Sequence, residues 1–231
     1  MIKKYTTAIK LSFADLIRNW KALIGIVALA FAFGIVVQIS SRLGVLGGFL
    51  AGLAQVGAYS YYFNWLSLSK HSKAIKFTEL KDFNQELFFA TLNVAFVFFI
   101  IEFILRSFQI GGQNQFFLLA INLLLFIIFN PIAEVIYKER PLQMEAFPTA
   151  LNFIKEHWLE WLIPILLICL PIFAISPQAV PLILASAEPM LPASILLRVT
   201  AVLLQPEFLL FLIIPAHWLM LFRSRFYDQL S

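Results

Sequence analysis

Charged residues are scarce in this chain of 231 residues. Asp, Glu, Lys and Arg together make up 13% of the sequence, whereas hydrophobic residues make up 61%. A soluble globular domain carries about 25% charged residues, so the composition excludes an ordinary soluble domain. The 25 Phe and five Trp residues suit a lipid-facing surface with aromatic belts at the membrane interfaces. The composition therefore predicts an integral membrane protein.

Cysteine, histidine and catalytic signatures are also scarce. Cys169 is the single cysteine, which excludes an internal disulfide. The three histidines lie far apart in the sequence, so no Cys/His cluster has the spacing of metal ligands. The chain has no nucleophile elbow, HExxH, Walker motif or Gly-rich phosphate loop. We therefore expect no metal, no cofactor and no catalytic residues.

Six apolar stretches are long enough to cross a bilayer, whose 30 Å core needs about 20 residues of helix. They cover residues 22–40, 43–65, 87–105, 116–137, 159–176 and 206–222. No linker rich in Gly, Ser or charge divides the chain. The sequence predicts an all-α polytopic protein with six transmembrane helices in one domain, residues 1–231.

The basic residues define a topology. Fourteen of the 17 Lys and Arg residues fall in four alternate segments: the N-terminus, the second-to-third and fourth-to-fifth connections, and the C-terminus. The positive-inside rule places these segments, and both termini, in the cytoplasm. The net charge of +4 is spread over these ends, where anionic lipids attract it, so we expect a lipid bilayer and no nucleic acid as partner.

An amphipathic helix is predicted over residues 4–20, before the first span. Its apolar residues recur at i, i+3, i+4 and i+7, with Asp15 and the basic residues on the other side. We expect this helix to lie in the membrane interface, buried on its Phe13 and Trp20 side. Similar segments precede the third and fifth spans, the latter ending at Trp158. Phe13, Trp20 and Trp158 are the expected interfacial anchors. The chain is then three copies of one helical-hairpin unit, or simply three ordinary hairpins.

The connection 177–205 is predicted to be extracytoplasmic, yet it is mostly apolar. Six of the 11 prolines lie between Pro171 and Pro206. We expect short broken helices that dip into the membrane or lie on its outer surface, because irregular backbone at membrane depth needs protein or a watery cavity beside it.

Gly44, Gly48 and Gly52 form a small-residue face at four-residue spacing on the second span. Such a face lets two helix backbones approach closely. The favoured interpretation is packing against another helix of the same chain, and a homodimer face is the alternative.

The candidate polar site within the spans consists of Asn130, Glu134, Glu207 and His217. Pro131 frees a backbone carbonyl beside Asn130 and Glu134, so this group could bind an ion or a headgroup. The alternative is a local pair of Glu134 with Lys138. Glu207 suits the first turn of the sixth helix or a cavity wall. His217 is a packing residue or a proton relay.

The stretch Asn130–Pro141, with Glu145-Ala146, Ala150-Leu151 and Trp158, resembles bacterial polytopic proteins similar to the membrane domain of glycerophosphoryl diester phosphodiesterases. The resemblance covers roughly residues 45–170. It implies a six-helix protein of the bacterial cytoplasmic (inner) membrane that serves as an anchor or accessory subunit. The chain has no soluble catalytic domain, so the resemblance implies no phosphodiesterase activity.

The layout also looks like the permease subunit of an ABC-2 type exporter, whose first cytoplasmic connection would dock on an ATPase. We expect a non-enzymatic membrane subunit or scaffold of a larger assembly, with protein partners. A transporter permease and an intramembrane lipid-modifying enzyme are the alternatives.

Overall fold

The computed structural model describes residues 2–69, 74–107, 115–141, 144–175 and 206–231, and the regular structure in these ranges is entirely helical. This confirms the all-α class. The elements are α1 (Ile2–Arg18), α2 (Lys21–Ser40), α3 (Gly44–Ser69), the 3-10 turn η1 (Glu79–Lys81), α4 (Gln85–Ser107), α5 (Gln115–Phe129), α6 (Ile132–Glu139), α7 (Ala146–Ile175) and α10 (Pro206–Leu230). The connection 177–205 lies outside the described residues.

Within the described ranges, three segments are long and apolar enough to cross a membrane, which supports a membrane protein. They are Lys21–Ser40, Glu79–Leu105 and Ala120–Glu139, with mean hydropathies of 2.6, 2.3 and 1.9. They correspond to the first, third and fourth predicted spans. The second predicted span forms α3, whose glycines and polar residues lower its hydropathy. Six crossings therefore stay a prediction.

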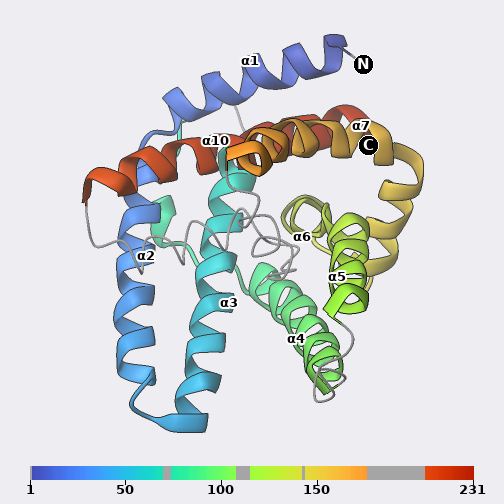
Figure 1. Cartoon of the computed structure of the whole chain (residues 1–231). Helices are drawn as coiled ribbons and strands as arrows, with labels where there is room; N and C mark the ends of the chain where they lie inside the picture. Colours follow the sequence, from blue (N-terminus) through green and yellow to red (C-terminus); the bar gives the residue numbers. More distant parts are fainter. Residues whose placement is uncertain (1, 70–73, 108–114, 142–143, 176–205) are drawn as a thin grey trace.

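The helices form a long hairpin and a layer across one of its ends. α2 and α3 run side by side, and α1 and α10 lie across the end of this hairpin (Figure 1). α1 and α10 are antiparallel: Tyr5 stacks on Phe226 at 4.6 Å between ring centroids, and Phe13 lies 5.0 Å from Trp218. α10 contains the sixth predicted span, so this span does not run parallel to the first two.

The fourth predicted span is broken, which corrects the expectation of one helix over 116–137. α5 ends at Phe129 and α6 begins at Ile132. Pro131 has no N–H to continue the helix, and its backbone (φ −81°, ψ 3°) is not helical. This break places Asn130 and Glu134 at the junction of the two helices.

The interfacial helix predicted before the third span is wrong. Only the three-residue turn η1 forms there, because Asn84 starts α4 anew: its Oδ1 accepts a hydrogen bond from the Leu87 N–H at 3.1 Å. Before the fifth span the predicted helix does form, as the first half of α7. A kink at His157 (φ −125°, ψ 15°) separates the halves. The predicted unit, an interfacial helix followed by a helical hairpin, is thus not repeated in the same form along the chain.

The buried face of α1 also differs from the prediction. Ala8, Ser12 and Asp15 are buried, whereas Phe13 is 49% and Trp20 52% exposed. Asp15 is buried because two arginines neutralise it, as described below. Phe13, Trp20 and Trp158 (55% exposed) stay available to a membrane interface, so their anchoring role stays a prediction.

The predicted glycine face is not packed within the described part of the chain. A Cβ atom built at Gly44, Gly48 or Gly52 meets no heavy atom within 4 Å, so no described helix packs against these positions, and both the packing and the homodimer interpretations stay predictions. Gly44 instead supplies the left-handed turn (φ +58°) at the start of α3. The close approach between α2 and α3 is made at Gly25, where a Cβ would lie 3.0 Å from Cη2 of Trp65.

The core lies where α3, α6, α7 and α10 meet. Aromatic rings dominate it, and Trp218, Phe222 and Phe226 stack along one face of α10. Fully buried side chains include Phe63, Leu66, Ile132, Ile136, Tyr137, Met220, Leu221 and Phe226. This packing encloses the polar residues of the candidate site.

Candidate functional site

Asn130 and Glu134 lie together in the core, where an arginine from α10 binds both. Arg223 Nε donates to Glu134 Oε1 at 2.8 Å, and Nη2 donates to Oε2 at 2.8 Å. Nη2 also donates to the Asn130 carbonyl oxygen at 2.7 Å. The side chain of Glu134 has no solvent exposure and that of Arg223 only 6%. The guanidinium therefore occupies the position that the sequence suggested for an ion or headgroup.

Trp161 of α7 closes the other side of this centre. Its Nε1 donates to Asn130 Oδ1 at 2.9 Å, and its ring lies 5.2 Å from the Arg223 guanidinium carbon. A cation over an indole face is attracted by the ring quadrupole. Asn130 Nδ2 has no hydrogen-bond partner among the described residues. α6, α7 and α10 are thus joined through one buried arginine.

The expected local pair of Glu134 with Lys138 is replaced by two longer-range pairs. Glu134 takes Arg223, and Lys138 Nζ lies 2.5 Å from Asp228 Oδ1. Both partners come from α10. The sequence alone could not identify these partners, because Arg223 lies 89 residues after Glu134 and Asp228 lies 90 residues after Lys138.

His217 lies in the same core but does not join the Glu134 carboxylate directly. Its Nδ1 is hydrogen-bonded to the Tyr62 hydroxyl of α3 at 3.1 Å, and its side chain is fully buried. Nε2 has no partner among the described residues. Glu207 follows Pro206 in the first turn of α10, but its side chain lies outside the described part of the structure.

Sequence reasoning missed Arg223, the central residue of the site, by counting it among the flanking cytoplasmic charges. A signal was present. Met220 and Tyr227 stand three residues before and four after Arg223, and this spacing places all three on one apolar helix face. A lone arginine within an apolar face needs a buried acid, and Glu134 was the available candidate.

A second charged network ties the end of α10 to α1. Arg225 Nε lies 2.5 Å from Asp15 Oδ2, and Nη2 donates to Oδ1 at 3.0 Å. This hydrogen bonding with Asp15 raises the pKa of Arg225. Arg18 also binds Asp15, and it donates to the Ser69 carbonyl oxygen of α3 at 2.9 Å. One buried carboxylate thus links the N-terminal and C-terminal helices.

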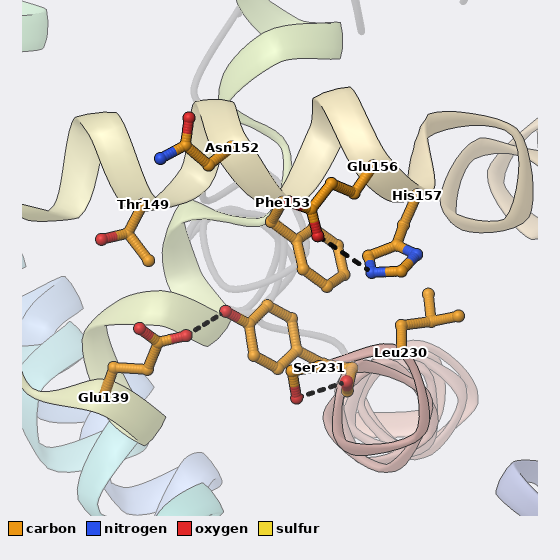
Figure 2. A pocket seen from close by; sticks show the side chains of 9 residues that line it. Glu139, Thr149, Asn152, Phe153, Glu156, His157, Leu230 and Ser231 are labelled. Carbon is orange, nitrogen blue, oxygen red and sulfur yellow. Dashed lines mark hydrogen bonds and ion pairs between the residues drawn. The ribbon is translucent and has the colours of Figure 1, made fainter.

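A pocket of about 270 Å³ opens between α6, the first half of α7 and the end of α10 (Figure 2). The Tyr227 hydroxyl on its floor donates to Glu139, and burial raises the pKa of Tyr227. The lining residues are Glu139, Thr149, Asn152, Phe153, Glu156, His157, Tyr227, Leu230 and Ser231. This pocket was not predicted from the sequence, because its α10 wall lies about 70–90 residues away along the chain from the α6 and α7 walls.

In both networks a buried carboxylate is paired with arginine, Glu134 with Arg223 and Asp15 with Arg225. In the described ranges no group of three or more His, Cys, Asp or Glu side chains could hold a metal ion. No family model matches the sequence, and no significant match to a curated protein or a solved structure is found.

Proposed function

We propose that this chain is a non-enzymatic subunit or scaffold of a larger assembly in the bacterial inner membrane. The observation that carries the proposal is the closed pairing of Glu134 with Arg223. Glu134 and Arg223 are charged residues in the apolar core. They bind each other and hold α6 and α10 together, so their role is structural. A transport or catalytic site would need such groups to be accessible to a substrate.

Contacts among the helix ends support the proposed topology, with both termini cytoplasmic and six crossings. Four segments carry most of the basic residues, and the structure brings them together. Arg18 and Arg225 share Asp15, Lys138 binds Asp228, and Arg140 lies 3.7 Å from Glu86. These pairs join the N-terminus, both basic connections and the C-terminus, as a common side of the membrane requires.

Exposed aromatic and aliphatic side chains support a lipid environment for α2, α3 and α4. Phe31 is 64%, Phe49 66% and Phe103 66% exposed. Leaving such side chains in water is unfavourable by about 25 cal/mol per Å² of apolar surface. A bilayer around these helices removes this cost.

The proposal is tested by purifying the tagged chain from its native membrane in a mild detergent and identifying co-purifying proteins by mass spectrometry. A tagged, unrelated multi-pass protein from the same membrane is the control. We expect a stable complex with at least one membrane protein that is not an ATPase. A stoichiometric ATPase would favour the permease, and a monodisperse single chain that converts lipid would contradict the subunit role.

A further inference from the structure

We propose that the pocket between α6, α7 and the end of α10 binds a small organic cation, an ammonium or a guanidinium group. The pocket is lined by nine residues from three helices and encloses about 270 Å³ (Figure 2). This inference does not rest on the proposed subunit function, because it follows from the charge, lining and size of the pocket.

The charge of the pocket is negative. Glu139 stands on the α6 wall and Glu156 on the α7 wall. Glu139 accepts a hydrogen bond from the Tyr227 hydroxyl, and Glu156 lies 3.8 Å from His157 Nε2. Among the described residues, neither carboxylate has a Lys or Arg partner. Two such carboxylates attract a cation and repel phosphates and other anions.

No lysine or arginine is among the residues that line the pocket, and the exposed Lys155 of α7 stands next to Glu156 in the chain but outside this lining. Lys138 binds Asp228 at 2.5 Å, Lys4 lies 3.8 Å from Glu160, and Arg140 lies 3.7 Å from Glu86. These three cations each have an acid partner outside the pocket. A ligand with one positive charge would supply the missing partner.

The floor of the pocket suits the apolar stem of such a ligand. The rings of Phe153 and Tyr227 stack at 4.4 Å between centroids, and Leu230 lies beside them. Lys138 Nζ lies 5.6 Å from the Tyr227 ring centroid, so this ring already has a cation over it and offers a ligand apolar contact only. Asn152 and Thr149 line the pocket from α7 and offer oxygen acceptors to further N–H groups.

The size of the pocket limits the ligand. Pockets for drug-sized molecules enclose about 300–1,000 Å³, so a volume of about 270 Å³ admits one ammonium or guanidinium group on a short stem. A nucleotide carries the wrong charge for this lining. The cation is either a free small amine or the Lys or Arg side chain of a partner protein.

The test is a titration of the purified full chain in detergent with ethylguanidinium, followed by saturation-transfer NMR. Ethylurea, a neutral molecule of nearly the same shape, is the control ligand. We expect saturable binding of ethylguanidinium and none of ethylurea. Equal binding of the two, or no saturable binding of either, would overturn the proposal.

Variants locate the binding. The side chain of Glu156 is 74% exposed, so Glu156→Gln should leave the melting temperature unchanged while it weakens ethylguanidinium binding about two- to fivefold, as expected for one exposed charge pair. Glu145→Gln makes the same charge change outside the pocket and should bind like wild type. Identical affinities for these two variants would contradict the assignment.

Glu139 needs a separate control, because it also binds Tyr227. Tyr227→Phe removes this hydrogen bond and keeps the Glu139 charge, so it should still bind ethylguanidinium. Glu139→Gln should lose more affinity than Tyr227→Phe at equal melting temperature. The opposite order would show that the carboxylate only positions the tyrosine.

The two sources of the cation are separated by photo-crosslinking. A benzophenone amino acid at Asn152, a residue of the pocket lining, is irradiated in cells that carry the wild-type chain, Glu156→Gln or Glu145→Gln. A protein adduct that Glu156→Gln alone reduces indicates a partner side chain. A small amine retained in native mass spectra, and lost with Glu156→Gln, indicates a free ligand. An adduct insensitive to Glu156→Gln counts against the site.

Discussion

At the residue scale, Arg223 connects the helices of the core, and its substitution would leave a buried charge without a partner. Two charges removed from water cost several kcal/mol each, and this cost is offset only by close pairing and further hydrogen bonds. Arg223 has both: a bidentate pair with Glu134 and a third bond to the Asn130 carbonyl oxygen. The pair therefore adds little net stability, but the loss of one partner leaves the other charge buried and alone.

Replacing Arg223 with methionine should destabilise the protein strongly. Arg223→Met keeps an unbranched apolar stem but removes the guanidinium and strands the Glu134 carboxylate, at an expected cost of about 3–5 kcal/mol. Unfolding in mild detergent, followed by tryptophan fluorescence during SDS titration, measures this loss. Arg42→Met is the control, because Arg42 is exposed in the turn between α2 and α3.

A second substitution separates the stranded charge from lost packing. The double variant Glu134→Gln/Arg223→Met should be more stable than Arg223→Met alone, because no buried charge is left unpaired. If Arg223→Met and Arg42→Met unfold at the same SDS fraction, the pair is not buried in the native protein.

At the element scale, the sequence predicts helices well and their faces poorly. The first span was expected over 22–40 and forms α2 over Lys21–Ser40, because the length of an apolar run fixes a membrane helix. The predicted exposure of Asp15 on the polar face of α1 is wrong, because Asp15 is buried against Arg225, which lies 210 residues away. The helix expected before the third span failed at Asn84, where a local cap overrides apolar periodicity.

The turn between α2 and α3 offers a prediction from two neighbouring glycines. A Cβ at Gly47 would lie 1.7 Å from the Ser40 carbonyl oxygen, whereas a Cβ at Gly48 meets nothing within 4 Å among the described residues. Gly47→Ala should therefore destabilise the hairpin by about 1–3 kcal/mol, because the backbone must move. Gly48→Ala should be neutral or add up to about 1 kcal/mol of helix propensity.

Melting temperatures of the two variants in the same detergent check this prediction. The two substitutions add the same methyl group at adjacent positions, so each is the control for the other. A loss of stability in Gly48→Ala, with Gly47→Ala unaffected, would reverse the geometry and restore the predicted packing role of Gly48.

Asp15 links α1 to Arg225 of α10, so its part in the attachment of α1 can be tested directly. Asp15→Asn removes the charge shared by Arg18 and Arg225, and we expect α1 to detach from α10 more often. Hydrogen exchange of amides 2–18 should become faster, while exchange in α2 and α3 stays unchanged. Glu145→Gln is the matched control for loss of one negative charge. Unchanged exchange in α1 would mean that the Tyr5 and Phe13 ring contacts suffice.

At the scale of the whole molecule, the layer of α1 and α10 organises the fold. These helices lie across one end of the α2–α3 hairpin, and the charged networks concentrate at that end (Figure 1). Apolar side chains are exposed on the hairpin itself. A bilayer favours this arrangement, with charged residues at one end of the hairpin and exposed apolar side chains along α2 and α3. The fifth and sixth predicted spans offer the sharpest test of this arrangement, because they decide how often the chain crosses the membrane.

The number of crossings is decided by the side on which residue 178 lies. In a chain whose single cysteine is removed by Cys169→Ala, new cysteines are placed one at a time at Ser72, Gln113 and Gln178. The charge distribution predicts that Gln113→Cys and Gln178→Cys react with an impermeant maleimide on intact cells. Ser72→Cys should react only after the cells are opened. Labelling of Gln178→Cys together with Ser72→Cys would show that α7 and α10 lie along the cytoplasmic face and that the chain crosses the membrane four times.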